Sequence, residues 1–431
     1  MVSDACLSPG SDYTQILKRE TASAIGCTEP VAVAYAVAKA KSLTDGEIKR
    51  IHVQLSRNMM KNAMGVGIPG TGMAGIDLAA ALGAFGGDAD AVLEVLHGIT
   101  PEGIAYAKGF AGDHVSVVLK DTPEKLYIEA EVESERDKVT VVIRGEHTNI
   151  TSVVKNGIVL CSEAAPVLRV EPFYAAADEL TVEGIFHFIR EVPAGEITFL
   201  FKIAEVNWRI AQEGLEKNYG LRVGRTSYEE VRRSGTFDDA RDYASSLAAA
   251  AADARMAGCM LPVMTLCGSG NQGITAMVPV IALCDYYEYD KESLLRALAL
   301  SCLVTIHVKR HIGKLSPICG CGLGSAIGVS AAVAYLRGGA REQIVSAIKN
   351  VIADISGIIC DGAKAGCALK VATVVNSAFM GAKLALRGLV AGSTDGIVSQ
   401  DVETCIRNIG RLGNEGMKDA DRTILDIMQR R

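Results

Sequence analysis

The pattern of hydrophobic and polar positions changes its period near residue 176. Before that point, β-branched and apolar residues partly alternate with polar ones, which is typical of half-buried strands. Turn residues separate the alternating runs. The pattern predicts strands at 48–56, 114–120, 125–134, 138–145, 149–156 and 157–162. The Asn156-Gly157 pair between the last two runs predicts a tight hairpin.

After residue 176 the apolar residues recur every three to four positions, as on one face of a helix. The helices predicted from this period cover 181–192, 195–219, 238–258, 290–313, 340–356, 364–388 and 401–413. Two more are predicted ahead of the strands, at 12–27 and 28–42, where Thr28 can cap the second helix and Pro30 suits its first turn. The predicted fold class is α+β, with N-terminal helices and a mostly antiparallel sheet followed by an all-helical domain.

The chain of 431 residues is long enough for two or three domains. We expect a helical segment at 1–45 that carries Cys27 and packs on the helical domain, a sheet domain at 46–175, and a helical domain at 176–431. Aromatic residues make up only 5% of the chain and 44 residues are glycine, so small aliphatic side chains must fill most of the interior. This composition favours helices that approach each other closely.

The formal net charge is −6 and no run of basic residues occurs, which argues against a nucleic-acid partner. The mean hydropathy of +0.23 is high. The apolar stretch at 244–264 nevertheless contains Asp253 and Arg255, so we interpret it as a buried helix and expect no membrane partner. The first 13 residues lack the features of a secretory signal, and twelve cysteines without one fit reduced thiols. We expect a cytoplasmic homo-oligomer that acts on a small molecule.

Four cysteines lie among glycines at the ends of apolar helical segments. Cys319 and Cys321 are two positions apart, and Cys360 and Cys367 are seven apart. This spacing is neither that of a zinc ribbon nor that of a ferredoxin, so spacing alone names no metal. The glycines would let the backbone approach a bulky inorganic group. A single such cysteine is more often a small core residue, but the four together favour a cluster site.

Cys27 stands at the start of a predicted helix. The aligned peptide dipoles at that end favour a thiolate and lower the pKa of a cysteine. On local grounds a buried packing cysteine is an equally good interpretation.

Two loops carry groups able to bind a small anion. Arg57, Asn58, Lys61 and Asn62 follow the first predicted strand and precede Gly70-Thr71-Gly72; together they could bind a carboxylate, although a solvated turn is the commoner explanation. The second loop, 266–273, places Ser269, Asn271 and Gln272 among glycines ahead of an apolar helix. It lacks the residue order of a dinucleotide-binding or P-loop motif.

Five motifs, taken together, resemble a known family. They are 26-GCTEP-30, 56-SRNMMKNAMGVGIPGTG-72, 267-CGSGNQGI-274, 313-GKLSPICGCG-322 and 356-SGIICDGAKAGCALK-370. Over nearly the whole chain the sequence resembles the L-cysteine desulfidase family, whose relatives include the alpha domain of bacterial iron–sulfur L-serine dehydratase. The resemblance implies a 4Fe–4S cluster, held by three cysteines with one iron open to substrate, and elimination of cysteine to pyruvate, ammonia and hydrogen sulfide.

The resemblance also implies roles for individual residues. Cys360 and Cys367 match the two late cluster ligands, and the early ligand falls at Cys319 or Cys321, with Cys319 preferred. Cys27 matches the proposed proton acceptor, and a thiolate there would supply the base. The short gap between the two late cysteines favours the desulfidase branch over serine dehydratase proper.

The substrate-binding residues are expected among the polar groups of these motifs. We predict Asn58, Lys61, Asn62, Thr71, Ser269, Asn271 and Lys314. His307, Lys309 and Arg310 could also neutralise a carboxylate, but such helix-end charges are more often surface groups.

Other functions remain open from the sequence. One is serine dehydration by the same cluster, because serine and cysteine differ only at the β-atom. Another is a pyridoxal-phosphate lyase using Lys314 or Lys364, against which stands the absence of a strand-linked phosphate cup. A third is a non-catalytic iron–sulfur or redox-sensing protein.

Overall fold

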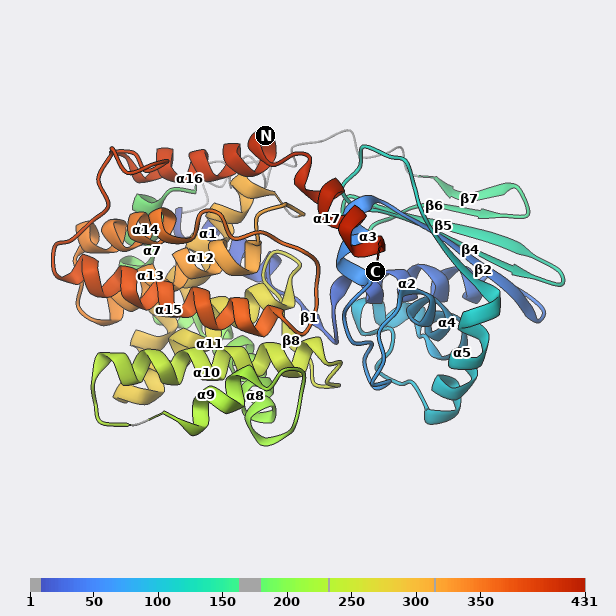
Figure 1. Ribbon diagram of the computed structural model, residues 1–431, viewed down its shortest axis with the longest axis horizontal. Coiled ribbons are helices and arrows are strands. Elements are labelled where there is room, and N and C mark those ends of the chain that lie inside the picture. The colour runs from blue at the N-terminus through green and yellow to red at the C-terminus, as the bar shows by residue number, and fades with distance from the viewer. Residues whose placement is uncertain (1–8, 163–179, 232, 314, 431) are drawn as a thin grey trace, which may run out of the picture.

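Figure 1 shows a helical body beside a smaller unit built on one sheet. The structure is a computed structural model and describes residues 9–162, 180–231, 233–313 and 315–430. The α+β class predicted from the change of period is confirmed.

The sheet has the six strands that the alternating pattern predicts. They are β2 (Ile48–Leu55), β3 (Val115–Leu119), β4 (Tyr127–Ser134), β5 (Lys138–Arg144), β6 (Ile150–Lys155) and β7 (Ile158–Ser162), in the spatial order β3-β2-β4-β5-β6-β7. β2 and β3 are parallel and every other neighbouring pair is antiparallel. The mostly antiparallel sheet is therefore confirmed. The parallel pair arises because helices separate β2 from β3 in sequence, as a parallel crossover requires.

The predicted hairpin between β6 and β7 is confirmed. Lys155 pairs with Ile158, and the two turn residues between them have positive φ, 52° at Asn156 and 81° at Gly157. Two consecutive positive φ values are those of a type I′ turn, whose twist matches that of the flanking strands.

Helices cover one side of the sheet: α2 (Thr28–Ser42), α4 (Ile76–Gly86) and α5 (Pro101–His114) lie below it in Figure 1. A Cβ on Gly83 would lie 2.2 Å from the carbonyl oxygen of Ala34, so α2 and α4 approach as closely as their small residues allow. The 3-10 turn η1 (Ala89–Glu94) follows α4. The segment after β2 is a helix, α3 (Arg57–Ala63), and not the loop expected from its polar residues.

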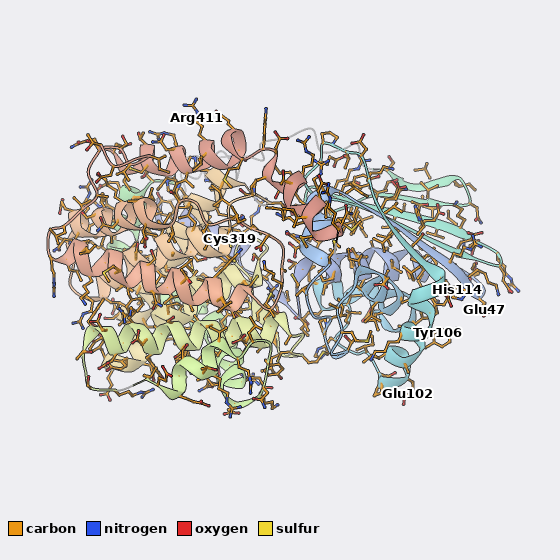
Figure 2. All side chains as sticks on the ribbon, in the orientation of Figure 1. Glu47, Glu102, Tyr106, His114, Cys319 and Arg411 are labelled. Carbon is orange, nitrogen blue, oxygen red and sulfur yellow. The ribbon has the colours of Figure 1, made fainter. Side chains whose placement is uncertain are left out.

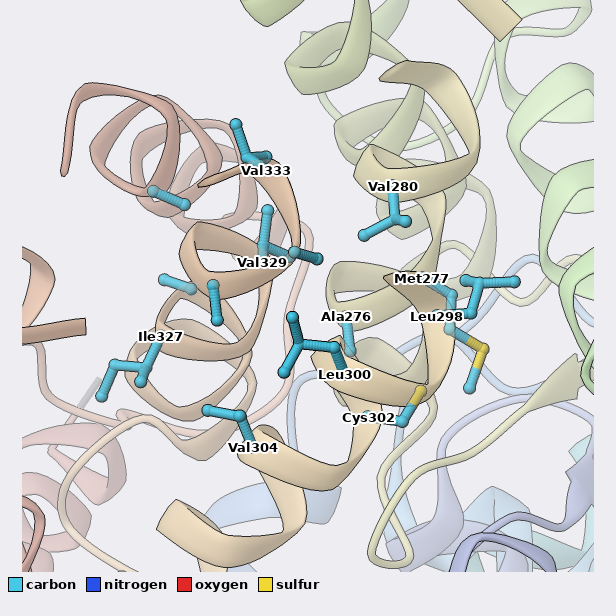
Figure 3. Close-up of a cluster of buried hydrophobic side chains, with 14 of the residues drawn as sticks. Ala276, Met277, Val280, Leu298, Leu300, Cys302, Val304, Ile327, Val329 and Val333 are labelled. Atoms are coloured by element: carbon cyan, nitrogen blue, oxygen red, sulfur yellow. The ribbon is translucent and has the colours of Figure 1, made fainter. Parts of the chain in front are cut away.

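The helical body has a helix in each of the seven ranges predicted from its period and one after loop 266–273, while α9 and α13 were not predicted. Its helices are α7 (Val182–Glu191), α8 (Phe199–Glu216), α9 (Val223–Glu229), α10 (Phe237–Met256), α11 (Gly270–Tyr287), α12 (Lys291–Ile312), α13 (Ser325–Leu336), α14 (Arg341–Ile355), α15 (Cys367–Leu386) and α16 (Val402–Arg411). Shorter turns are η2 (Ala194–Ile197), η3 (Gly320–Gly324) and η4 (Leu412–Gly416). Figure 3 shows small and branched side chains of α11, α12 and α13 packed together, among them Ala276, Leu300 and Val329. The expectation of an interior filled by small aliphatic residues is met here.

The two ends of the chain cross between the units. α1 (Pro9–Arg19) packs on α7 and α12, and β1 (Ser23–Ala24) pairs with β8 (Val263–Met264) of the helical body. By contrast, α2 belongs to the hydrophobic core of the sheet unit. The expected packing of segment 1–45 on the helical domain therefore describes α1 and β1 but not α2. At the other end, α17 (Ala420–Gln429) leaves the helical body and packs on α3.

α15 is long and apolar enough to cross a membrane by length and composition alone. In this fold it packs against α10, α13 and α14, which bury one face of it, including Val371, Val375 and Phe379, while Leu369 and Met380 on the helix stay exposed. The apolar stretch at 244–264 that sequence analysis interpreted as a buried helix is likewise mostly α10, which is buried from Tyr243 to Met256.

Candidate active site

One cavity between the two units is lined by most of the residues whose side chains could bind a ligand or take part in a reaction. The sheet unit contributes Cys27, Thr28, Glu29 and Asn62. The helical body contributes Arg255, Ser269, Asn271, Gln272, Lys309, Cys319, Cys321, Cys360, Cys367 and Lys370. Figure 2 shows Cys319 on the side of the helical body that faces the sheet unit. The cavity is therefore completed only when both units are folded and joined.

Close backbone contacts hold the two units together beside this cavity. The Gly67 amide donates to the Met256 carbonyl at 3.0 Å, and the Gly70 amide to the Gly258 carbonyl at 3.2 Å. Gly362 has a φ of +89°, and a Cβ there would lie 2.3 Å from the Lys61 carbonyl oxygen. Only glycine fits that position without moving the loop that carries Cys360.

The two cysteine-bearing loops are joined by backbone pairing. Ile318 and Ile359 form an antiparallel bridge. On either side of it, the Cys319 amide donates to the Ile358 carbonyl at 2.9 Å, and the Cys360 amide donates to the Pro317 carbonyl at 2.7 Å. Cys367 is the first residue of α15. Local hydrogen bonds thus bring together cysteines that are about forty residues apart in sequence.

Cys319 and Cys321 compete for one position. Their sulfur atoms are 3.4 Å apart, too close for each to bind a different iron of one cluster without moving. The hydrogen bond from Cys321 lowers the pKa of Cys319 to about 6, against the effect of burial and with help from the Lys370 charge. The same hydrogen bond and burial raise the pKa of Cys321. Cys319 is therefore the better anionic ligand of the two.

The thiols fit a multi-iron cluster better than a single ion. Within the described residues, no three His, Cys, Asp or Glu side chains are grouped closely enough to hold one metal ion. The cysteines that ligate an iron–sulfur cluster bind different irons, so they stand farther apart than the ligands of one ion. Three thiol positions line one cavity from two adjoining loops and a helix start: the Cys319 and Cys321 pair, Cys360, and Cys367. Such a donor set suits a cluster held by three cysteines.

The buried Lys309 and the half-buried Lys370 place positive charge beside the thiols. A Cβ on Gly320 would lie 2.5 Å from Lys309 Nζ, so the ammonium reaches the C-x-C loop directly. Burial lowers the pKa of Lys309, and its charge interacts with four cysteines, including Cys319 and Cys360. Lys370 donates to the Ile359 carbonyl at 2.8 Å and forms an ion pair with Asp361. These two charges help to lower the pKa of Cys319, whereas burial raises the pKa of Cys360 and of Cys367. Thiolate is the form that binds metal, so Cys319 is the thiol best prepared to do so.

Cys27 is the N-cap residue of α2, so the predicted helix start at residue 28 is confirmed. The cap carries no side-chain hydrogen bond, so Thr28 is not the capping residue. Cys27 Sγ donates instead to Glu29 Oε2 at 3.0 Å. Burial and the Glu29 charge raise the pKa of Cys27. The lowered pKa that the helix-start position predicts for Cys27 is wrong, because desolvation of a fully buried thiolate outweighs the helix dipole.

Glu29 is the acidic group of the cavity. Its Oε1 accepts from Asn62 Nδ2 at 3.0 Å, and its Oε2 accepts from Thr28 Oγ1 at 3.2 Å. Burial alone would raise the pKa of Glu29, but the His147 charge and the Cys27 hydrogen bond lower it overall. Glu29 is therefore a carboxylate. Sequence analysis assigned it no role, although a glutamate two residues after Cys27 was the available signal.

Several buried polar atoms facing the cavity have no hydrogen-bond partner. They are Asn62 Oδ1, Arg255 Nε and both amide atoms of Gln272. Arg255 Nη1 donates to Asn271 Oδ1 at 3.0 Å, and the Ser269 hydroxyl caps α11. A buried polar atom without a partner costs about 1–3 kcal/mol, so a site that keeps several of them is built to receive a polar ligand.

Comparison with known proteins shows the family to which this chain belongs. The profile of the serine dehydratase alpha chain matches residues 92–426. This chain belongs to the serine dehydratase alpha chain family. It is also similar to full-length relatives that carry only the name UPF0597 protein. The relative from Clostridium perfringens strain SM101 is 41% identical over 96% of this chain and 97% of its own length, and that from Aeromonas salmonicida is 43% identical over 97% and 96%.

In this member of the serine dehydratase alpha chain family, the predicted site residues separate into two groups. The cavity brings together Cys27, Asn62, Ser269, Asn271 and the four central cysteines. Asn58 and Lys61 do not line it, because both bind Asp421 of α17, at 2.7 and 2.5 Å. Lys61 also donates to the Cys360 carbonyl at 2.8 Å, so it supports a cysteine-bearing loop from outside.

The remaining candidates lie elsewhere. The Thr71 hydroxyl donates to the Ile68 carbonyl within its own turn at 2.9 Å. His307 is bound to Glu403 at 2.6 Å, and Glu403 also accepts from the first amide of α7. Lys314 lies outside the described residues. Arg255 and Lys370 face the cavity, and sequence analysis assigned neither to the site, because a charged residue inside an apolar helix does not show by itself which way it points.

Proposed function

We propose that this protein is an iron–sulfur lyase that eliminates hydrogen sulfide from L-cysteine and yields pyruvate and ammonia. The observation that carries the proposal is the convergence of five thiols, one carboxylate and three cations on a single cavity. Membership of the serine dehydratase alpha chain family supports the reaction class.

Cys319, Cys360 and Cys367 would hold a 4Fe–4S cluster, with Cys321 beside them as a thiol outside the ligand set. When bound, the cluster supplies a Lewis acid that withdraws charge from the substrate and its leaving group. Lys309 and Lys370 hold positive charge beside the ligand thiolates and so offset the cost of burying negative sulfur.

Cys27 and Glu29 would move the proton. β-Elimination removes the Cα proton and breaks the Cβ–S bond; the resulting enamine tautomerises and is hydrolysed to pyruvate and ammonia. Because Cys27 is a thiol that donates to Glu29, the carboxylate can take the Sγ proton as the thiolate takes the Cα proton. Burial makes that thiolate a stronger base than one in water.

L-Serine is the second candidate substrate, and the family description favours it. Hydroxide is a poorer leaving group than hydrosulfide, so the same cavity would need to protonate the departing oxygen. The deciding assay measures pyruvate from each amino acid under anaerobic conditions, with sulfide determined in parallel. Sulfide and pyruvate in equal amounts from cysteine, at a higher kcat/KM than from serine, support the desulfidase; the reverse preference supports the dehydratase. No pyruvate from either, with iron bound, refutes both and favours a sensor.

Cys27→Ser separates a base from a structural thiol. Serine is nearly isosteric but has a much higher pKa, so turnover should fall by ~10²-fold or more while iron and fold are retained. Loss of iron would instead identify Cys27 as a ligand, and unchanged turnover would make it a packing residue.

We also propose a cytoplasmic location and a homo-oligomeric state. All eleven cysteines in the described part of the chain are free thiols, as in a reducing compartment. The edge strand β7 exposes Ile158, Val159 and Leu160, which another copy could cover. Light scattering of the purified protein tests the oligomer.

A further inference from the structure

The cavity contains two opposite charges whose hydrogen bonds go to other residues. Glu29 comes from α2 of the sheet unit, and Arg255 comes from the last turn of α10 in the helical body. Their charges interact, since Arg255 helps to lower the pKa of Glu29. In the described structure, however, the hydrogen bonds of Glu29 come from Cys27, Thr28 and Asn62, and that of Arg255 goes to Asn271. Each charge therefore keeps bonding capacity for a ligand.

Unpartnered atoms of matching polarity belong to residues that line the same cavity as these two charges. Asn62 Nδ2 donates to the Glu29 carboxylate, which fixes the amide so that Oδ1 is an acceptor next to the negative charge. In the helical body, Arg255 Nε is a donor without a partner. Gln272 offers a second unpartnered amide donor near the C-x-C loop, where a Cβ on Gly320 would lie 3.1 Å from its Oε1. All three side chains are buried: Arg255 is 3% exposed, Gln272 0% and Asn62 8%. Bulk water therefore cannot supply the missing hydrogen bonds.

We propose that this arrangement binds the two charged groups of a free α-amino acid: Glu29 and Asn62 Oδ1 accept hydrogen bonds from the α-ammonium, and Arg255 Nε and Gln272 Nε2 donate to the α-carboxylate. This inference rests on the proposed function for the identity of the ligand. A zwitterion held in this way spans the two units and leaves its side chain to face the cysteines.

The other two cations of the cavity are less suited to the carboxylate. Lys370 is already bound to Asp361 and to the Ile359 carbonyl. Lys309 lies against the C-x-C loop, where its charge faces thiols. Arg255 alone among the three presents a planar fork, which matches the geometry of a carboxylate.

L-Alanine tests the inference without turnover, because it has both charged groups and no β-leaving group. We would measure its binding to the anaerobic holoprotein by calorimetry, beside ethylamine, which lacks the carboxylate, and propionate, which lacks the ammonium. Wild-type protein should bind alanine at least about 30-fold more tightly than either fragment, because each fragment leaves one buried charge without its partner.

Two variants locate the carboxylate. Arg255→Gln should weaken alanine by about 30-fold or more and leave ethylamine unchanged. Gln272→Met should weaken alanine by about 10-fold. It should not lower Tm, because both amide atoms of Gln272 are unpartnered in the free protein. It therefore answers the question even if Arg255→Gln folds poorly.

Glu29→Gln locates the ammonium, since it should weaken alanine and leave propionate unchanged. Arg296→Gln is the matched control; this arginine is bound to Glu292 and the Ile189 carbonyl, away from the cavity, and its loss should not affect alanine binding.

Equal alanine affinity in wild type, Arg255→Gln and Gln272→Met would overturn the carboxylate assignment. Alanine binding no tighter than that of the fragments would overturn the whole inference, whether or not the enzyme converts cysteine. The expected binding pattern in a protein that releases no pyruvate from cysteine or serine would keep the amino-acid site and refute the proposed function instead.

Discussion

Lys61 offers the sharpest test of the fold around the site, because the sequence indicated a substrate-binding lysine and the structure makes it a support. Its side chain is 1% exposed and lies 2.5 Å from Asp421, which is itself 10% exposed. Lys61→Met removes the cation and leaves the Asp421 carboxylate buried, with Asn58 as its one remaining side-chain donor among the residues that the structure describes. Breaking a buried pair in this way costs about 3–5 kcal/mol, and the remaining Asn58 bond places this case near 3 kcal/mol.

That loss should appear first where α17 docks on α3. We expect faster hydrogen–deuterium exchange in Ala420–Gln429, and a fall in the Tm of the sheet unit of roughly 6–12 °C. Iron content should also fall, because the Lys61 hydrogen bond to the Cys360 carbonyl is lost. Lys349→Met is the matched control: this buried lysine lies in the helical body and, within the described residues, donates a hydrogen bond to the Gln400 carbonyl alone.

A double variant separates the two effects of Lys61. Replacing both partners, as in Lys61→Met with Asp421→Leu, removes the unpaired charge and should recover most of the stability. It cannot restore the bond to the Cys360 carbonyl, so iron content should stay low. A Lys61→Met protein with normal α17 protection and normal iron, but with a raised KM, would refute this reasoning and restore the substrate-binding interpretation.

Three other changes have definite expected outcomes. Cys319→Ser should abolish iron binding while Cys321→Ser retains it, measured by iron and sulfide content after anaerobic reconstitution; equal loss in both would contradict a single ligand in that pair. Gly362→Ala should lower iron content and Tm, because the new Cβ would lie 2.3 Å from the Lys61 carbonyl oxygen at a φ of +89°. The pKa of Asp137 is lowered to about 2, first by the Asp45 backbone amide and then by Lys155 and Asn156. Its contribution to stability is therefore complete above its ordinary pKa of about 3.9 and lost as pH falls toward 2; Asp137→Asn should flatten that part of the urea-unfolding profile.

The sequence by itself determined the class of fold and most of its elements. Alternation along 48–162 predicted every strand of the sheet, because a side chain in a strand faces either the core or solvent at every second position. Asn156-Gly157 predicted its turn, since few other residues accept two positive φ values in succession. The helical period likewise predicted most helices of the helical body. The helices missed were α3, α5, α9, α13 and α17, because amphipathic signals are weak in helices that are short or rich in alanine and glycine.

Tertiary structure decided which polar residues meet. Asn58, Lys61 and Asn62 lie within one short helix, yet the first two face Asp421 and only Asn62 faces the cavity, because successive positions on a helix point in different directions. The pKa of Cys27 was likewise decided by burial and by Glu29, neither of which a helix-start motif reveals. Arg255 and Gln272 gain their place in the cavity from contacts between α10, α11 and the cysteine-bearing loops. Such contacts depend on how two cores pack, and a one-dimensional pattern does not contain that information.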